Sequence, residues 1–162
     1  NGHKAQRFEG GIRVPYILRW PAKLRPGQVY TEPVSTLDFY PTFCEAAGIV
    51  PPEGTIIDGV SLLPYISGEK TGTPHDVLYW KTHQSIAVRQ GDWKLIVEPW
   101  GKPMLFNLND DGAEQKNVAR QHPEIAEQLQ KRAEQWSEAF PPPVSTKPKA
   151  PTGGKSQNQT KP

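Results

Sequence analysis

Prolines and glycines interrupt this chain so often that only a few stretches can form long helices or strands. The 162 residues include 18 prolines and 14 glycines. Proline fixes φ and removes a backbone donor, and glycine loses the most conformational entropy on folding, so both favour turns over regular elements. With a hydrophobic fraction of 35%, this texture predicts one ordinary domain or two small units.

Residues 141–162 have a composition that does not support folding. They hold six prolines and four lysines and no acidic residue. Such a segment buries too little apolar surface to offset the entropy of ordering, so we expect a disordered Pro/Lys-rich tail. The tail carries a charge of +4 in a chain of net charge +2, which leaves about −2 on residues 1–140. We therefore expect no nucleic-acid partner.

Two further classes of protein are excluded by simple counts. Cys44 is the one cysteine, so an internal disulfide or a cysteine-based zinc site cannot form within the chain. No apolar run in the sequence approaches the roughly 18 residues that a membrane-spanning helix needs. We therefore expect no membrane span.

Residues 75–140 predict a compact α+β unit. Gln90-Gly91-Asp92 has the composition of a tight hairpin between two short apolar runs. Pro123 opens a segment with one apolar face, typical of a helix with proline in its first turn. We expect an antiparallel sheet with one face covered by this helix. The predicted strands are Val77–Trp80, Ser85–Arg89, Trp93–Val97 and Met104–Asn107.

Residues 1–70 predict less regular structure. The run Ile12–Trp20 predicts a buried strand interrupted at Pro15. Asp38 is the candidate N-cap of a helix that ends at Gly48. We expect this segment to be unable to stand alone.

The sequence GHKAQRFEGGIRVP near the N-terminus is the strongest indication of a chemistry. Lys4 precedes Glu9 by five residues, and Gly10 and Gly11 follow. An ammonium group on a turn can hold an anion, and paired glycines allow a close approach that a Cβ would forbid. For Glu9 and Arg13, an ion pair that orders the turn is favoured over contact with a substrate.

Taken together, residues 2–138 resemble the C-terminal third of a type I sulfatase, of the arylsulfatase branch of the alkaline phosphatase superfamily. Each matching block is short, but their order and spacing are those of the family. The resemblance implies an α/β fold: the C-terminal end of an alkaline-phosphatase-like catalytic domain over residues 1–70, then the small α+β unit. The blocks are GHK at 2–4, FEGGIRVP at 8–15, RWP at 19–21, TLDFYPT at 36–42, DGVSL at 58–62, AVRQGDWKL at 87–95 and LFNL at 105–108.

The resemblance also implies hydrolysis of sulfate esters by an extracytoplasmic enzyme, whether periplasmic, secreted or lysosome-like. The family uses a formylglycine nucleophile and a calcium ion, and neither the formylglycine motif nor the calcium ligands match any part of this chain. Of the family's catalytic set only Lys4 matches, and the family's lysine contacts the sulfate and the leaving-group oxygen. The chain alone is therefore expected to be inactive and to pack against the N-terminal part of the catalytic domain.

Other residues are weaker candidates. His3 adjoins Lys4, and Lys81 and His83 lie where the family often places substrate-selecting loops. Each could face a sulfated small molecule or glycan, or simply lie at the surface. Two other functions stay open: hydrolysis of phosphate or phosphonate esters, and non-catalytic binding of sulfated glycans.

Overall fold

The computed structural model describes residues 1–82 and 85–140. The predicted disordered tail, 141–162, and the candidate His83 lie outside the described residues. Within the described part, no helix is both long and apolar enough to cross a membrane. The helices are α1 (Glu9–Ile12), α2 (Phe39–Ala47), α3 (Leu63–Ser67) and α4 (Pro123–Glu138), and the strands are β1 (Val77–Lys81), β2 (Ile86–Gln90), β3 (Trp93–Val97) and β4 (Met104–Asn107).

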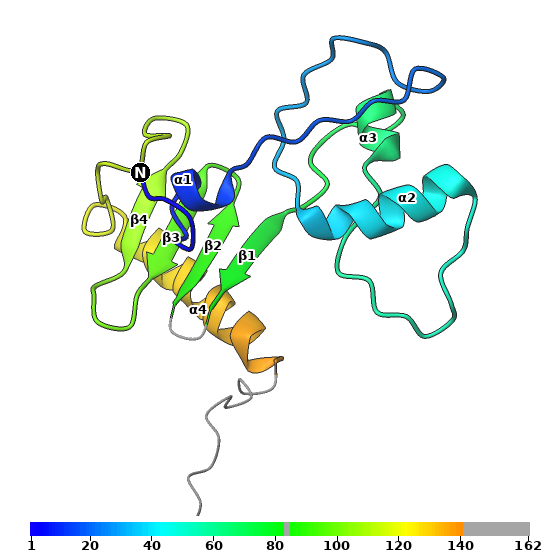
Figure 1. The fold of residues 1–162 in the computed structure, drawn as a ribbon. Coiled ribbons are helices and arrows are strands. Elements are labelled where there is room, and N and C mark those ends of the chain that lie inside the picture. Colours follow the sequence, from blue (N-terminus) through cyan, green and yellow to red (C-terminus); the bar gives the residue numbers. More distant parts are fainter. Residues whose placement is uncertain (83–84, 141–162) are drawn as a thin grey trace, which may run out of the picture.

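The antiparallel sheet is present as predicted, and its four strands lie in the order β1-β2-β3-β4 (Figure 1). Gly91 lies between β2 and β3 with φ +56°, a conformation that glycine adopts at little cost. The pairing of Gln90 with Trp93 closes this hairpin. Because successive side chains point to opposite faces of a strand, the sheet presents two different faces for burial.

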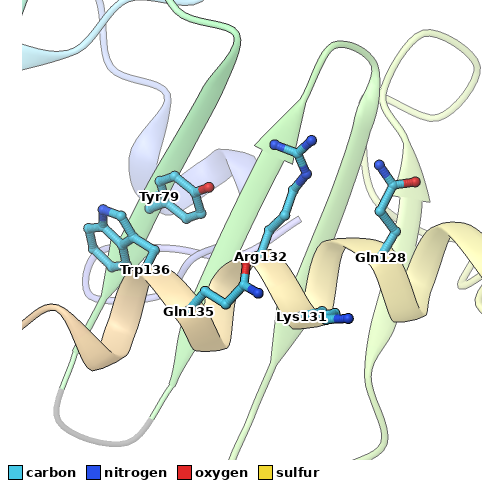
Figure 2. Close-up of a pocket in the computed structure, with 6 residues that line it drawn as sticks. All are labelled: Tyr79, Gln128, Lys131, Arg132, Gln135 and Trp136. Carbon is cyan, nitrogen blue, oxygen red and sulfur yellow. The ribbon is translucent and has the colours of Figure 1, made fainter.

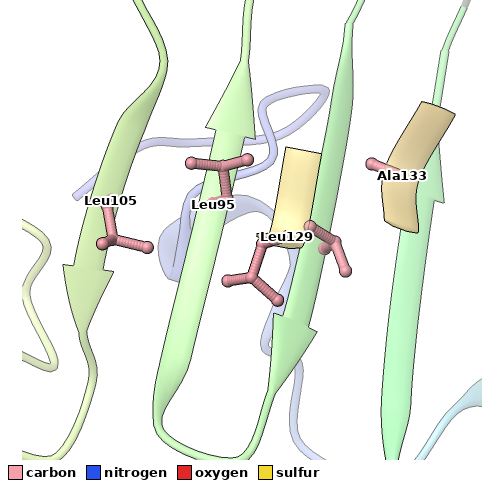
Figure 3. Close-up of a cluster of buried hydrophobic side chains, with 5 residues drawn as sticks. Leu95, Leu105, Leu129 and Ala133 are labelled. Atoms are coloured by element: carbon pink, nitrogen blue, oxygen red, sulfur yellow. The ribbon is translucent and has the colours of Figure 1, made fainter. Parts of the chain in front are cut away.

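Helix α4 covers one face of the sheet, as its apolar spacing predicts. Its Leu129 and Ala133 pack against Val88, Leu95 and Leu105, and all five side chains are at most 2% exposed (Figure 3). Full burial of one such aliphatic side chain stabilises a fold by about 1.5–3 kcal/mol. The sheet and α4 therefore share an apolar core of their own.

The N-terminal residues cover the opposite face of the sheet, which the sequence did not predict. Phe8 packs against a second buried cluster of Ala87, Ile96 and Phe106. The rings of Phe8 and Phe106 meet edge to face with centroids 6.0 Å apart. In Figure 1, α1 and α4 lie on opposite sides of the sheet. The segment that carries Lys4 is thus in contact with the sheet, although α2 and α3 come between them in sequence.

The predicted strand over Ile12–Trp20 is wrong. Residues 13–20 form no strand, and Ile17 is 87% exposed. Pro15 removes a backbone donor, and no strand of the described sheet runs beside this segment to complete a ladder. An apolar run alone did not show whether a partner strand exists.

A buried carboxylate organises the region around α2. Asp38 is fully buried, and its oxygens accept the N–H groups of Ser35 at 2.7 Å and Val60 at 3.0 Å. Each oxygen also lies 2.9 Å from Nε2 of His75. One side chain therefore joins three segments of the chain.

Helix α2 begins directly after Asp38 and ends at Gly48 in the left-handed conformation, both as predicted, but the predicted side-chain cap is not formed. Asp38 makes no side-chain cap to α2. It is instead the third residue of a 3₁₀ turn, Thr36–Asp38, and forms a capping box with Ser35. The cap assignment failed because Ser35 and Asp38 themselves have the spacing of a capping box.

The described residues leave the apolar face of α2 uncovered. Tyr40 is 49% exposed and Phe43 is 56% exposed. Other large apolar side chains of the same region are exposed as well, so this region has no closed apolar core among the described residues. They are Val14, Ile17, Val29, Leu37, Ile49, Val50 and Ile56.

Candidate active site

Lys4 occupies the corner of a tight turn. The N–H of Gln6 donates to the carbonyl of His3 at 3.0 Å, and Ala5 has φ +72°. A positive φ at the third position is the mark of a type II turn, which places Lys4 at the second position. Lys4 is exposed, and no described residue pairs with its ammonium group. The turn therefore presents a cation that can meet an anion.

Gly10 and Gly11 place α1 directly against this turn. A Cβ on either glycine would collide with backbone carbonyl oxygens of residues 1–6, those of His3 and Gln6 in the case of Gly11. Only glycine allows two backbone segments to approach this closely. Because of this contact, a shift of α1 must shift the turn that carries the lysine.

Glu9 forms a buried ion pair with Lys94 of β3, so the predicted pair between Glu9 and Arg13 is wrong. Its Oε1 lies 2.8 Å from Nζ of Lys94, whose side chain is fully buried. Arg13 is exposed, and only its backbone N–H contacts Glu9, through the carbonyl at 2.8 Å. Sequence reasoning missed Lys94, although a lysine between apolar residues of a buried strand requires a counterion beside it.

Glu114, in the loop after β4, completes the cluster around Lys94. Its Oε1 lies 2.7 Å from Nζ of Lys94, and its Oε2 accepts the N–H of Glu9 at 2.5 Å. Glu114 is 1% exposed and has φ +54°, a left-handed conformation that non-glycine residues rarely adopt. The "Lys94 cluster" is defined here as Glu9, Lys94 and Glu114.

Asp111 holds the loop that delivers Glu114. Its Oδ2 accepts the N–H groups of Lys116 and Gln115, both at 2.8 Å. These hydrogen bonds, the one from Lys116 first, hold the pKa of Asp111 below its usual value. The ionised carboxylate therefore stabilises the loop conformation.

The structure does not bring all the weaker candidates to Lys4. His3 is next to it, and the His3 ring Nδ1 lies 3.0 Å from the carbonyl of Lys4. Lys81 reaches the other side of the sheet, where its Nζ donates to the carbonyl of Ser137 at the end of α4. A substrate contact by Lys81 together with Lys4 is not supported by this placement.

A shallow hollow lies beside α4, on the face of the sheet away from Lys4 (Figure 2). The rings of Tyr79 and Trp136 stack there at 4.7 Å, with Lys131 and Arg132 nearby. The stack assigns Trp136 to packing between sheet and helix. This hollow is separate from the site that contains Lys4.

The donor set for calcium is not found in this part of the protein. Among the described residues, no group of three or more His, Cys, Asp or Glu side chains could hold a metal ion. Calcium prefers six to eight oxygen ligands, and the buried carboxylates here are already paired with Lys94 or His75. The described residues do not fit a calcium ion.

The fold and the motifs match one family over most of the chain. The family model described as "N-sulphoglucosamine sulphohydrolase, C-terminal" covers residues 3–139. The chain belongs to this sulfatase family. The matched residues include both the Lys4 turn and the sheet with α4.

Relatives in sequence are sulfatases. The chain is 30% identical to the uncharacterized sulfatase YdeN of Escherichia coli (strain K12), over 89% of this chain and 32% of the relative. It is 29% identical to an N-acetylgalactosamine-6-O-sulfatase of Bacteroides thetaiotaomicron, over 79% of this chain and 28% of the relative. The chain therefore spans about a third of the length of these relatives.

Solved structures give the same result for the fold. A Bacteroides thetaiotaomicron structure from work on the metabolism of multiple glycosaminoglycans (BT33336S-sulf) matches with a TM-score of 0.65 at 27% identity, over 80% of this chain and 30% of that chain. Ps i-CgsB, solved in complex with k-i-k-neocarrahexaose, matches with a TM-score of 0.66 at 26% identity, over 77% of this chain and 29% of that chain. The predicted fold class, the C-terminal end of the sulfatase fold with a small antiparallel unit, is confirmed.

Proposed function

We propose that this chain supplies one wall of the active site of a sulfate-ester hydrolase, with Lys4 as the residue that contacts the sulfate. The observation that carries the proposal is the exposed ammonium group of Lys4, set at a turn corner without a partner among the described residues. Membership of the sulfatase family supports the same chemistry.

The chemistry of Lys4 follows from its charge. An ammonium group is a compact cation with three donors, so it stabilises sulfate oxygens and the negative charge that develops on the leaving oxygen as the S–O bond breaks. A preorganised group gives this stabilisation without reorganising during the reaction. The turn with Ala5 in a left-handed conformation fixes the backbone from which the Lys4 side chain extends.

The other catalytic groups belong, in this proposal, to the rest of the parent protein. These are the formylglycine nucleophile and the calcium ion that the resemblance implies. The substrate is a sulfated small molecule or glycan, in line with the carbohydrate names of several relatives. The parent is proposed to act outside the cytoplasm, and the described chain alone to be inactive.

The uncovered apolar face of α2 fits the same proposal. Tyr40 and Phe43 lie on this face, and most of the exposed large apolar side chains belong to residues 14–56. In this proposal these exposed apolar side chains are part of an interface with further protein. The partner is the N-terminal part of the catalytic domain, since the family relatives are about three times as long as the matched region.

The test uses the full-length parent and a sulfate-ester substrate. Lys4→Met is expected to lower kcat/KM by about 10²–10³-fold, the loss typical of removing one preorganised donor to a developing charge. Lys102→Met is the matched control, since Lys102 is an exposed lysine of the loop between β3 and β4. A change within about threefold for Lys4→Met would refute the role of Lys4.

The same enzyme separates sulfatase from phosphatase activity. Paired aryl sulfate, aryl phosphate and phosphonate monoester substrates share a leaving group, so the ratio of their kcat/KM values reports the transferred group alone. Preference for the sulfate ester supports the proposal, and preference for the phosphorus esters favours the alternative. Residues 1–162 alone are expected to hydrolyse none of them.

A further inference from the structure

The Lys94 cluster is a buried set of charges that the chemistry of Lys4 does not explain. Lys94 and Glu114 are fully buried as side chains, and Glu9 is 10% exposed. The surrounding face of the sheet is apolar, with Ala87, Ile96 and Phe106. Burying charges is costly, and a well-packed apolar set is often as stable as a buried ion pair. Stability alone is therefore a weak reason for the cluster.

The geometry of the cluster fixes α1 from two sides. Glu9 is held through its carboxylate by Lys94 and through its backbone N–H by Glu114. The side-chain amide of Asn1 also donates to the carbonyl of Glu114 at 3.2 Å. Side chain and backbone contacts together leave α1 little freedom to slide or rotate on the sheet.

The position of α1 sets the position of Lys4. Gly10 and Gly11 of α1 lie against the backbone of residues 1–6, as the collisions of an added Cβ show. A shift of Glu9 therefore also shifts the Lys4 turn, because the backbone contacts between them leave no room for α1 to move alone. Apolar contacts such as that of Phe8 do not direct α1 in this way, since they are not directional.

We propose that Lys94 and Glu114 are positioning residues for Lys4, which they place through Glu9 and α1. This inference rests on the proposed function for the catalytic role of Lys4. It gives the small C-terminal sheet a part in catalysis, because the sheet carries the charge that fixes one wall of the active site. A misplacement of a catalytic group by about 1 Å can lower turnover by about 100-fold.

The first test is a double-mutant cycle in the full-length parent. Lys94→Met is expected to lower kcat by about 10–100-fold with a smaller change in KM, because it misplaces Lys4. In a Lys4→Met background the same substitution is expected to change kcat by less than about threefold. An equal loss in both backgrounds, or no loss in either, overturns the proposal. Lys102→Met is the control in both backgrounds.

A second variant covers the case in which Lys94→Met does not fold. Glu114→Gln keeps the shape of the side chain and an oxygen that accepts the N–H of Glu9, but removes the charge that faces Lys94. It is expected to lower kcat by about tenfold, again only when Lys4 is present. A loss of the same size without Lys4 contradicts the proposal.

Hydrogen exchange tests the inference without any activity. Lys94→Met or Glu114→Gln is expected to speed exchange of the Gly10 and Gly11 amides by about tenfold and to leave the Val88 amide in β2 unchanged. Unchanged protection at both glycines overturns the inference. If Lys4→Met leaves kcat/KM unchanged while the glycine amides respond, the proposed function fails and the positioning of the turn stands.

Discussion

The sheet with α4 and the region around α2 are held together by different forces. The sheet buries an apolar cluster of Val88, Leu95 and Leu105 under α4. The region around α2 is held by the buried carboxylate of Asp38, and many of its large apolar side chains are exposed. The difference indicates that the sheet contains its own core, whereas the other region needs further protein to complete one.

Residues 1–12 are attached to the sheet and not to the region around α2. They share buried contacts with β3 and with the loop after β4, through the Lys94 cluster. The turn that carries Lys4 is therefore attached to the self-contained half of the molecule. Three substitutions test how far the two regions differ.

The largest effect is expected from truncation in the core of the sheet. Leu95→Ala removes a fully buried side chain and is expected to lower the free energy of unfolding by about 2–5 kcal/mol. Ile17→Ala, at an 87% exposed position, is the matched control and is expected to change it by at most about 0.5 kcal/mol. Urea unfolding of the chain measures both, and similar losses would contradict the comparison.

A smaller and more local effect is expected from Asp38→Ala. The change leaves the N–H groups of Ser35 and Val60 without their acceptor. Because both hydrogen bonds are only part-buried, water recovers part of the cost of about 1–3 kcal/mol that a fully buried unpaired group carries. Amide exchange at Val60 is expected to speed up while that at Val88 is unchanged. Equal acceleration at both amides would show that the two regions unfold as one.

The smallest effect concerns Asp111 and the pH. Its pKa in the folded chain is lowered by the N–H groups of Lys116 and Gln115, so its stabilisation is present above the ordinary carboxyl pKa of about 4 and is lost as the pH falls through the lowered value. Asp111→Asn is expected to make stability fall less steeply in this acid window. An unchanged acid slope of the unfolding free energy would contradict this assignment.

The sequence predicted elements whose signals are local. The four strands, the hairpin at Gly91 and the start of α4 at Pro123 all follow from periodicity and turn chemistry, and all are present. The wrong ion pair concerned a partner far away in sequence, whereas the side-chain cap of α2 failed for a local reason, the capping box of Ser35 and Asp38. The ion pair of Glu9 was assigned to nearby Arg13, because nothing in the local pattern shows that Lys94 lies beside it across 85 residues.

At the candidate site, too, local features could be predicted and contacts with distant residues could not. The Lys4 block could be found from its residues, and the glycines were expected to allow a close approach. The cover of the second sheet face by Phe8 could not be predicted, because an isolated phenylalanine in a polar segment has no periodicity. The one available signal was Lys94 itself, a charge in a strand whose other residues are apolar.

If the Lys4 turn belongs to the sheet and not to the region around α2, hydrogen exchange on residues 1–162 will show it. The amides of Ile12 and Arg13, which donate to carbonyls of Phe8 and Glu9, are expected to exchange with a free energy within about 1 kcal/mol of that of Val88. Val60 is expected to exchange at a clearly lower free energy. If the amides of Ile12 and Arg13 exchange at the same free energy as that of Val60, well below that of Val88, the Lys4 turn does not belong to the sheet.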